Sequence, residues 1–480
     1  MITQRRRTLV LALLTTLMPA CDRATDPAAI APQFHEKEEH IDCDASQVDC
    51  VAELDQPATY QHSKNMHLMG ISRRTVAHGT SIFNTDLAFS GRLVYQGTYD
   101  GFRVIDISQP DNPIEIALYN DCSPGSTDGS QGDLVVWNNL LVRSWNNDAD
   151  DTATCGGQPV GFNFEGLHVF DVANPAAPRL LASINLLCGS HTAMAVPDPA
   201  NDRLLIYSAP SSRTDDCPGL DIVEIPVANP AAATYLRFEP SHFPNETVGI
   251  PCHDGGVILG AVQLVACAGG RGLAVWSLSA AAGGSLEDPA LLYTTEVPGV
   301  GIGHSAAFTW DGEVIVFGHE PGGGSQAMCR TTSDVVDRTL FFLRARTGAQ
   351  LGSFVLPRAQ TAQENCTWHY YNVIPIDGRY MLVAGNYQSG ISVVDFTNPA
   401  NAREVAFADP APLVNPANPT AIVLGGDWSA YWYNGFIYES DIRRGLLVWR
   451  LSDGVVAGAA KLERLNPQTQ ETSAPVKGRK

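Results

Sequence analysis

The sequence predicts an all-β fold, a seven-bladed β-propeller of four-stranded antiparallel blades. Three observations predict it: a strand-and-turn pattern that recurs seven times, a predicted hairpin upstream of the recurring strand, and a near absence of helical 3.6-residue periodicity. Units of four antiparallel strands, repeated seven times, are typical of a closed ring of blades.

The recurring pattern is a glycine or arginine, an alternating strand that often ends near an aspartate, and a turn. Its clearest form is GFRVIDISQPDNP, which starts at Gly101. The other instances start at Gly166, Gly219, Gly272, Arg338, Gly390 and Gly445, at intervals of roughly 50 to 65 residues. Upstream pairs of short strands meet at DG or NG turns, as in residues 304–320, 369–387 and 428–441. Each unit therefore supplies a hairpin followed by two further strands.

The two ends of the repeat region predict how the ring closes. The seventh unit ends at LLVWRLSDG without a fourth strand, whereas NMHLMGISR (residues 65–73) is a strand without a partner before the first unit. We expect this N-terminal strand to complete the seventh blade. A closed ring leaves no long exposed sheet edge.

Two segments, RLVYQGTYDGFRVIDISQPDNPIEI and GISVVDFTNPANAREVAF, resemble the LVIVD-repeat family of bacterial exported proteins. The resemblance extends over most of residues 80–452, although the units at Gly272 and Arg338 lack the D-x-[ST]-x-P-x-x-P ending. It implies a propeller in the periplasm or on the cell surface. It implies no particular activity.

The first residues are typical of an export signal. Arg5, Arg6 and Arg7 precede an apolar run over residues 8–18, which is too short to span a bilayer. The following Met-Pro-Ala-Cys resembles a bacterial lipobox and predicts lipidation of Cys21; simple secretion, with cleavage near Ala20, is the alternative. Lipidation would make the protein an envelope lipoprotein, periplasmic or surface-exposed, held by its acyl chains alone.

The cysteine count agrees with export. The chain has 11 cysteines, and assigning Cys21 to the lipid leaves an even number for disulfides. Pairing sequence neighbours predicts five bonds, although other connectivities stay open: Cys43 with Cys50, Cys122 with Cys155, Cys188 with Cys217, Cys252 with Cys267, and Cys329 with Cys366. No CxxC spacing indicates zinc or thiol-redox chemistry.

Composition favours a folded domain and argues against a nucleic-acid partner. The chain is 44% hydrophobic but only 17% charged, which favours a packed core, and its net charge of −20 argues against nucleic acid as a partner. We expect a signal peptide over residues 1–20, an acidic tether over 21–64, the propeller over 65–455 and a disordered tail over 456–480. We expect a monomer.

Aligning the first strand of each unit places one set of polar residues at a common register near the axis. The set contains four histidines and three aspartates, which are His191, His253, His304, His369, Asp86, Asp133 and Asp254. Imidazole suits transition metals, so a divalent metal ion is a candidate cofactor. The alternative is that these side chains tie neighbouring blades together by hydrogen bonds to the backbone.

A second candidate set follows the second strand of the units, on loops at one face of the ring, where binding residues commonly lie. It comprises Asp100, Trp145, Arg271, His319, Glu320, Tyr387, Glu439, Asp441 and Arg444. Glu320 and Glu439 are candidates for paired carboxylates, whereas Arg444 pairing with Asp441 or Glu439 is the purely structural alternative. The acidic run NNDADD (residues 146–151) is either a loop calcium site or a solvated loop.

These features favour a non-enzymatic scaffold that binds a protein or a glycan on the bacterial envelope. A metal-dependent enzyme centred on the four histidines is the alternative, and a purely structural envelope component is a third. The sequence contains no HExxH, nucleophile-elbow or phosphate-loop motif. No catalytic residue is therefore assigned.

Overall fold

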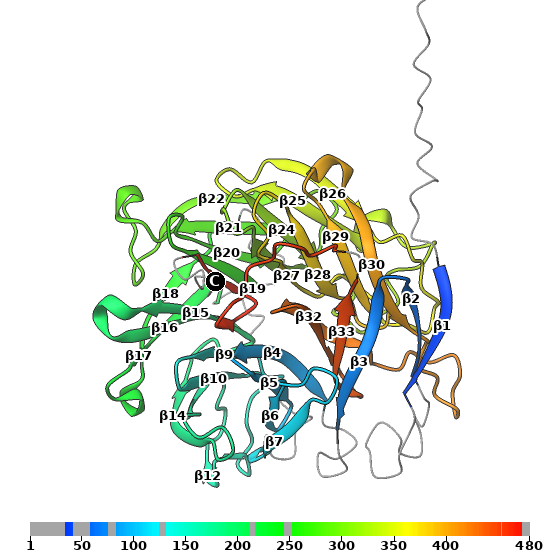
Figure 1. Ribbon diagram of the computed structural model, residues 1–480. Coiled ribbons are helices and arrows are strands. Elements are labelled where there is room, and N and C mark those ends of the chain that lie inside the picture. The colour runs from blue at the N-terminus through cyan, green and yellow to red at the C-terminus, as the bar shows by residue number, and fades with distance from the viewer. Residues whose placement is uncertain are drawn as a thin grey trace, which may run out of the picture.

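Seven four-stranded antiparallel sheets surround a central axis, so the predicted seven-bladed propeller is confirmed (Figure 1). The computed structural model describes residues 34–41, 58–74, 83–123, 131–211, 217–243, 252–452 and 454–472. Blades are numbered here in chain order. Cys21, Cys43 and Cys50, for which lipidation and one disulfide are predicted, lie outside the described residues.

Blades 1 to 4 each run from the innermost strand outward, in the order given for each. Blade 1 contains β4 (Asn84–Ser90), β5 (Leu93–Thr98), β6 (Gly101–Asp106) and β7 (Ile114–Tyr119); blade 2 contains β9 (Leu134–Trp137), β10 (Leu140–Trp145), β13 (Gly166–Asp171) and β14 (Arg179–Asn185); blade 3 contains β15 (Thr192–Asp198), β16 (Arg203–Ala209), β17 (Gly219–Pro226) and β18 (Thr234–Pro240); blade 4 contains β19 (Cys252–Leu259), β20 (Leu264–Gly269), β21 (Gly272–Ser277) and β22 (Ala290–Glu296).

Blades 5 to 7 repeat the order. Blade 5 contains β23 (Gly303–Phe308), β24 (Val314–His319), β25 (Thr339–Arg344) and β26 (Gln350–Val355); blade 6 contains β27 (Tyr370–Val373), β28 (Met381–Gly385), β29 (Ile391–Asp395) and β30 (Arg403–Pro410); blade 7 contains β31 (Asp427–Tyr433), β32 (Phe436–Asp441), β33 (Gly445–Leu451) and β3 (Met66–Arg73). A small separate sheet holds β8 (Cys122–Ser123), β11 (Thr154–Cys155) and β12 (Gln158–Pro159).

Helical structure within the described part of the chain is limited to 3₁₀ turns, namely η4 (Pro199–Asn201), η5 (Pro230–Ala232), η7 (Ala280–Ala282), η8 (Val335–Arg338) and η9 (Pro399–Asn401). Across these same residues, no helix has the length and apolarity needed to cross a membrane.

Steric crowding explains the glycine that opens the repeated pattern. Gly101 and Gly166 start the third strands of blades 1 and 2 with φ near +155°. A Cβ at Gly101 would lie 1.8 Å from the Tyr119 carbonyl oxygen, and one at Gly166 would lie 2.0 Å from that of Ile184. Only glycine allows the fourth strand to approach so closely.

The closing aspartate of the pattern has a local role as well. At the end of β6, Asp106 Oδ1 accepts a hydrogen bond from the Ser108 amide at 2.8 Å. Asp395 Oδ1 accepts one from the Thr397 amide at 3.0 Å. These turns reverse the chain toward the fourth strand.

The core is divided among the gaps between blades. The described residues form seven hydrophobic clusters, and each cluster joins apolar side chains of adjacent blades. Blades 1 and 7, for example, meet through Phe89 and Tyr433, whose ring centroids stack 4.8 Å apart. A ring without a central core leaves the axis free for polar groups.

Ring closure follows the prediction. β3 pairs antiparallel with β33, from Met66 opposite Leu451 to Arg73 opposite Gly445. Four of the predicted disulfides are also present, Cys122–Cys155, Cys188–Cys217, Cys252–Cys267 and Cys329–Cys366. Disulfides in this number are typical of an exported protein.

The expected tether contains strands. β1 (Phe34–Ile41) pairs with β2 (Ala58–Ser63), and β2 pairs with β30, so blade 6 extends to six strands. The open outer edge of β30 provides unsatisfied backbone groups that an added strand can pair with. Tyr60 of β2 is also buried in the cluster between blades 6 and 7.

Part of the tail that was expected to be disordered is ordered, because residues 464–472 enter the central channel (Figure 1). β34 (Arg464–Leu465) pairs with β4, and β35 (Thr469–Glu471) pairs parallel with β19. Between them, the Asn466 side chain hydrogen bonds to both the amide and the carbonyl of Val136 in β9. Thr469 Oγ1 donates to the Ala195 carbonyl in β15 at 2.8 Å. We call residues 464–472 the channel segment.

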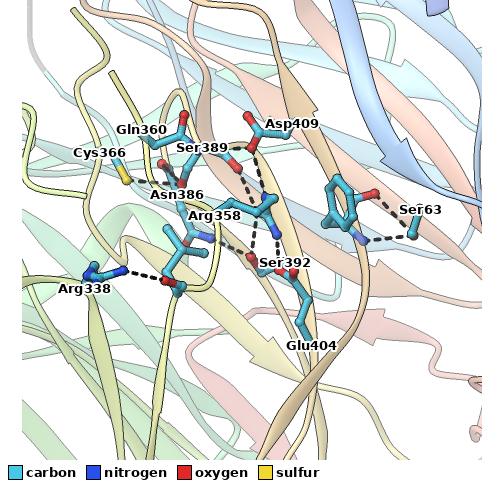
Figure 2. Close-up of polar contacts among 12 residues, drawn as sticks. Ser63, Arg338, Arg358, Gln360, Cys366, Asn386, Ser389, Ser392, Glu404 and Asp409 are labelled. Atoms are coloured by element: carbon cyan, nitrogen blue, oxygen red, sulfur yellow. Dashed lines mark hydrogen bonds and ion pairs between the residues drawn. The ribbon is translucent and has the colours of Figure 1, made fainter. Parts of the chain in front are cut away.

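A buried ionic network fixes the connection between blades 5 and 6 (Figure 2). Arg358 pairs with Glu404, and its Nε lies 2.9 Å from Asp409 Oδ2. The same guanidinium donates to the Ser389 carbonyl and to Ser392 Oγ. We call these residues the Arg358 network.

Candidate metal centre on the propeller axis

A belt of hydrogen bonds fixes the backbone at the axial register. The carbonyl of the register residue in one blade accepts a hydrogen bond from a side chain of the preceding blade. The donors and acceptors are Thr85 to Gly132, Ser144 to His191, Thr192 to His253, Ser305 to His369, His369 to Trp428, and Ser440 to Thr85. Mostly hydroxyl groups tie the blades together, and one histidine takes part.

The four axial histidines lie side by side on blades 3, 4, 5 and 6. Ring centroids are 4.2 Å apart between His191 and His253, 4.2 Å between His253 and His304, and 4.6 Å between His304 and His369. We call these four residues the axial histidine cluster. The sequence alignment thus placed four residues far apart in the chain at one site.

Hydrogen bonds at Nδ1 set the tautomers of two of these rings. His369 Nδ1 lies 2.5 Å from the Trp428 carbonyl oxygen, which can only accept, so Nδ1 carries the proton. His304 Nδ1 contacts Ser305 Oγ, whose own proton is donated to the His369 carbonyl, so His304 Nδ1 is also the donor. The neutral rings therefore present Nε2 as a lone pair, and a metal-binding histidine is commonly fixed in this way.

Glu320 and Tyr387 lie beside the axial histidine cluster, although the sequence analysis assigned them to the face-loop set. Glu320 Oε2 is 3.8 Å from His304 Nε2 and 4.0 Å from His253 Nε2, and Oε1 is 3.8 Å from His369 Nε2. Tyr387 donates its hydroxyl to Glu320 Oε1 at 2.8 Å. Nitrogen and oxygen ligand atoms of His253, His304 and Glu320 all lie within 4.8 Å of one another.

The backbone of Tyr387 is strained at this point. It has φ of +52°, a left-handed conformation that is uncommon for a residue other than glycine. Two backbone hydrogen bonds of 3.0 Å with Asp427 hold it there. Such strain persists only where the surroundings enforce it.

Burial keeps two of the imidazoles, those of His304 and His369, neutral. It lowers the pKa of His369 to about 3 and places the pKa of His304 well below its ordinary value. Burial, followed by the nearby Glu320, raises the pKa of Tyr387 well above its ordinary value. Neutral imidazoles and one carboxylate form a donor set suited to zinc, copper, iron or nickel.

The three axial aspartates form a separate layer on blades 1, 2 and 4. Besides burial, the charges of Asp86 and Asp254 raise the pKa of Asp133, and the charge of Asp86 raises the pKa of Asp254. The channel segment reaches this layer, since Gln468 Nε2 lies 2.9 Å from Asp86 Oδ2 and 3.4 Å from Asp133 Oδ1. The predicted axial set is thus divided into a histidine part and an aspartate part.

Three other face-loop residues, Glu439, Asp441 and Arg444, are buried together on blade 7. Arg444 Nη1 lies 2.8 Å from Asp441 Oδ2, as the structural alternative predicts. Glu439 accepts hydrogen bonds from Tyr60 and Trp449 at 2.9 and 2.6 Å. Glu439 therefore does not join Glu320 as a paired carboxylate.

The remaining face-loop residues do not enter the cluster. Trp145 is buried and stacks on His168, with ring centroids 5.2 Å apart. His319 Nε2 lies 2.7 Å from the Val336 carbonyl oxygen. Asp100 accepts a hydrogen bond from Thr98 Oγ1, and Arg271 is exposed.

Sequence reasoning missed three contributors to the axis. Asn146, from the acidic run, lies 3.1 Å from His191 Nδ1 through its Oδ1. Tyr431 donates to Asp86 Oδ1 at 2.6 Å, and Gln468 comes from the expected tail. Tyr431 belongs to no motif, and the acidic run indicated no axial position for Asn146, so only the three-dimensional arrangement places these two residues at the axis.

Comparison with known proteins agrees with the repeat. The LVIVD repeat matches residues 84–121. No curated protein matches the chain. Solved structures that the comparison matches to the chain include the computationally designed Ika8 protein (12% identity, 82% of this chain and 93% of that chain, TM-score 0.41) and BamB from Moraxella catarrhalis (10% identity, 76% of this chain and 80% of that chain, TM-score 0.40). The chain is a seven-bladed β-propeller that carries an LVIVD repeat.

Proposed function

We propose that this protein is an envelope-anchored binding propeller whose axial histidine cluster holds one transition-metal ion. The ion would be the binding centre at the mouth of the channel. The export signal and the four disulfides support a location outside the cytoplasm, and Cys21 supplies the lipid anchor in this proposal.

One observation carries the metal proposal. His304 Nε2 makes no hydrogen bond within the described residues, yet it is fully buried and lies 3.8 Å from a carboxylate oxygen. His369 Nε2 faces the same carboxylate at 3.8 Å. Lone pairs that converge on a carboxylate repel it unless a proton or a cation lies between them. A divalent metal ion satisfies all three groups at once.

The metal centre is compatible with both uses considered for the fold. As a binding scaffold, the protein would use the ion and the surrounding loops to hold a protein or glycan ligand. As an enzyme, the ion would polarise a substrate, and Glu320 would hold or transfer a proton beside it. The absence of a catalytic motif in the sequence favours the scaffold.

Metal content of the exported, oxidised protein, purified without a histidine tag, tests the proposal. We expect about one transition-metal ion per chain, and loss of that ion in a His304→Gln/His369→Gln variant. His67→Gln is the matched control, since His67 lies on β3 and contacts Ser452 instead of the cluster. A folded wild-type protein without metal, or equal metal content in both variants, would refute the metal centre and return the search to protein and glycan ligands of the loop face.

A further inference from the structure

A pocket of about 290 Å³ lies between blades 5 and 6, at the far ends of the innermost strands from the axial histidine cluster. His304 is at the start of β23 and His369 directly precedes β27, whereas the pocket is formed by the turns that follow these two strands and by the C-terminal part of the chain. Its volume suits a small ligand. Six lining residues carry the argument, namely Trp310, Asp311, Asp377, Arg379, Tyr380 and Glu471.

Two aromatic side chains form fixed walls of this pocket. Trp310 donates its indole N–H to the Val373 carbonyl at 2.7 Å. The Tyr380 ring packs on Phe396, with ring centroids 5.5 Å apart, and its hydroxyl donates to Asp311 Oδ2 at 2.6 Å. Both rings are only half-buried, so each keeps an accessible part. Because these contacts hold the rings in place, a ligand would not have to order them.

The Asp311 carboxylate beside these rings is held in its charged form. It accepts hydrogen bonds from the Thr309 hydroxyl at 2.6 Å and from the Glu313 amide at 3.1 Å, in addition to the one from Tyr380. Burial raises the pKa of Asp311, but these hydrogen bonds outweigh it and lower the pKa below its ordinary value. The carboxylate is therefore ionised at neutral pH.

The basic lining residue does not neutralise the pocket. Arg379 donates through Nη1 to the Val455 carbonyl at 3.0 Å, and its Nη2 lies 3.8 Å from Asp395 Oδ2, so its partners are elsewhere. Glu471 is paired with Arg464 at 2.8 Å. Within the described residues, neither Asp311 nor the exposed Asp377 forms an ion pair. The pocket thus combines two aromatic rings with two carboxylates that no cation balances.

We propose that this pocket binds a small organic cation with a quaternary ammonium group. A cation within about 6 Å of an aromatic ring is attracted by the electron-rich face of the ring, and the two carboxylates add to that attraction. A primary ammonium would need three hydrogen-bond acceptors, whereas Asp311 already accepts three hydrogen bonds. A quaternary ammonium needs none. The site takes no part in the proposed metal centre.

Titration calorimetry of the full-length protein with choline chloride, referenced to sodium chloride, tests the proposal. We expect saturable binding of one choline per chain. The uncharged analogue of the same shape, 3,3-dimethyl-1-butanol, should bind about 10-fold more weakly, because it lacks the charge that the rings and carboxylates attract. This comparison uses the wild-type protein alone and does not depend on any variant folding.

Variants then locate the site. Trp310→Leu should weaken choline binding about 10-fold, and Asp377→Asn, at an exposed turn, should weaken it about threefold. Asp202→Asn is the matched control, since Asp202 is exposed at the corresponding turn of blade 3, and it should bind as the wild type does. The His304→Gln/His369→Gln variant should also bind choline normally, which separates this site from the metal centre. Cosedimentation with phosphatidylcholine vesicles, blocked by choline, would assign the ammonium group to a lipid headgroup, and choline binding without cosedimentation would assign it to a free solute.

Three results would overturn the proposal. A folded wild-type protein that binds no choline would leave the pocket without this ligand. Equal affinity for choline and its uncharged analogue would reject recognition of the charge. Unchanged affinity in both Trp310→Leu and Asp377→Asn would place the cation elsewhere on the acidic surface.

Discussion

Replacing Arg358 by methionine should destabilise the protein strongly. The Arg358 side chain is 9% exposed, and those of its partners Glu404 and Asp409 are 3% and 14% exposed. The guanidinium also lies 4.5 Å above the Phe407 ring. Methionine retains much of the apolar contact but leaves two buried carboxylates without their cation.

The structure sets the size of the effect. Removing one partner of a buried ion pair costs about 3–5 kcal/mol, because the remaining charge is neither solvated nor paired. Asp409 keeps a hydrogen bond of 3.0 Å from Gln360, so Glu404 accounts for most of the loss. For a domain of this size, that loss corresponds to a fall in melting temperature of roughly 4–6 °C.

The effect should also depend on pH in a defined direction. Burial raises the pKa of Asp409 to about 6, although Arg358 opposes that rise. When folding raises the pKa of a carboxyl, the folded protein loses stability as the pH rises from the pKa of the unfolded state to the pKa of the folded state. Without Arg358 the pKa rises further, so the variant should lose more stability at pH 8 than at pH 5.

Chemical denaturation with disulfides intact, at both pH values, measures the difference in unfolding free energy. Arg403→Met is the matched control, because Arg403 also pairs with a carboxylate of blade 6, at 3.5 Å from Asp395, but is 57% exposed. The control should change stability by less than about 1 kcal/mol. Equal losses of stability in both variants, or an Arg358→Met effect that does not grow with pH, would contradict a role of the Arg358 cation in neutralising Glu404 and Asp409.

Three further variants test other parts of the structure. His168 is fully buried, and neither of its ring nitrogens has a hydrogen-bond partner in the described part of the chain. Burial lowers its pKa to about 3. His168→Phe should therefore stabilise the protein by about 1–3 kcal/mol and reduce the stability that is lost as the pH falls from 6.5 to 3. Asn466→Ala should cost about 2–3 kcal/mol, because it leaves the amide and carbonyl of Val136 without their partner. Replacing Cys188 and Cys217 by alanine should cost about 3–4 kcal/mol for their separation of 29 residues.

Measured free energies of unfolding test all three variants, and a different result would contradict each prediction. A destabilised His168→Phe protein would indicate that aromatic packing there tolerates no larger ring. For the channel segment, Asn418→Ala at an exposed turn is the control, and equal losses would argue against a structural role for the segment. For the disulfide, unchanged stability would indicate that the unfolded chain is already restricted.

Local rules explain why the blades could be predicted. The glycine of the repeat is required where Gly101 meets the carbonyl of Tyr119, and the aspartate of the repeat caps a turn at Asp106, so the pattern reports geometry directly. The closing strand β3 could be predicted because the seventh unit lacked a fourth strand and residues 65–73 lacked a partner.

The polar character of residues 464–472 led to a wrong expectation of disorder. The channel is lined by backbone edges and carboxylates, so polar side chains are the ones that fit inside it.

The candidate site was predictable only in part, for a similar reason. The histidines share a register, which alignment of the repeats reveals. Glu320 and Tyr387 follow second strands, and whether such a loop turns inward to the axis or outward to solvent depends on tertiary packing. Trp145 and Glu320 occupy comparable positions in the repeat, yet one packs in a blade interface and the other faces the histidines.

The way the ring is closed has a consequence for how the chain folds. β3 pairs with β33, and β4 pairs with β34, so each of these early strands needs a partner from the other end of the chain. The first and last blades are therefore complete only when both ends of the polypeptide are present. Contacts between residues so distant in sequence slow folding, because the entropy of closing the loop is lost before the contacts form. We therefore expect an unfinished chain to remain an open arc with exposed blade faces. Final closure would then be the slow step, completed only after residue 472 has been synthesised.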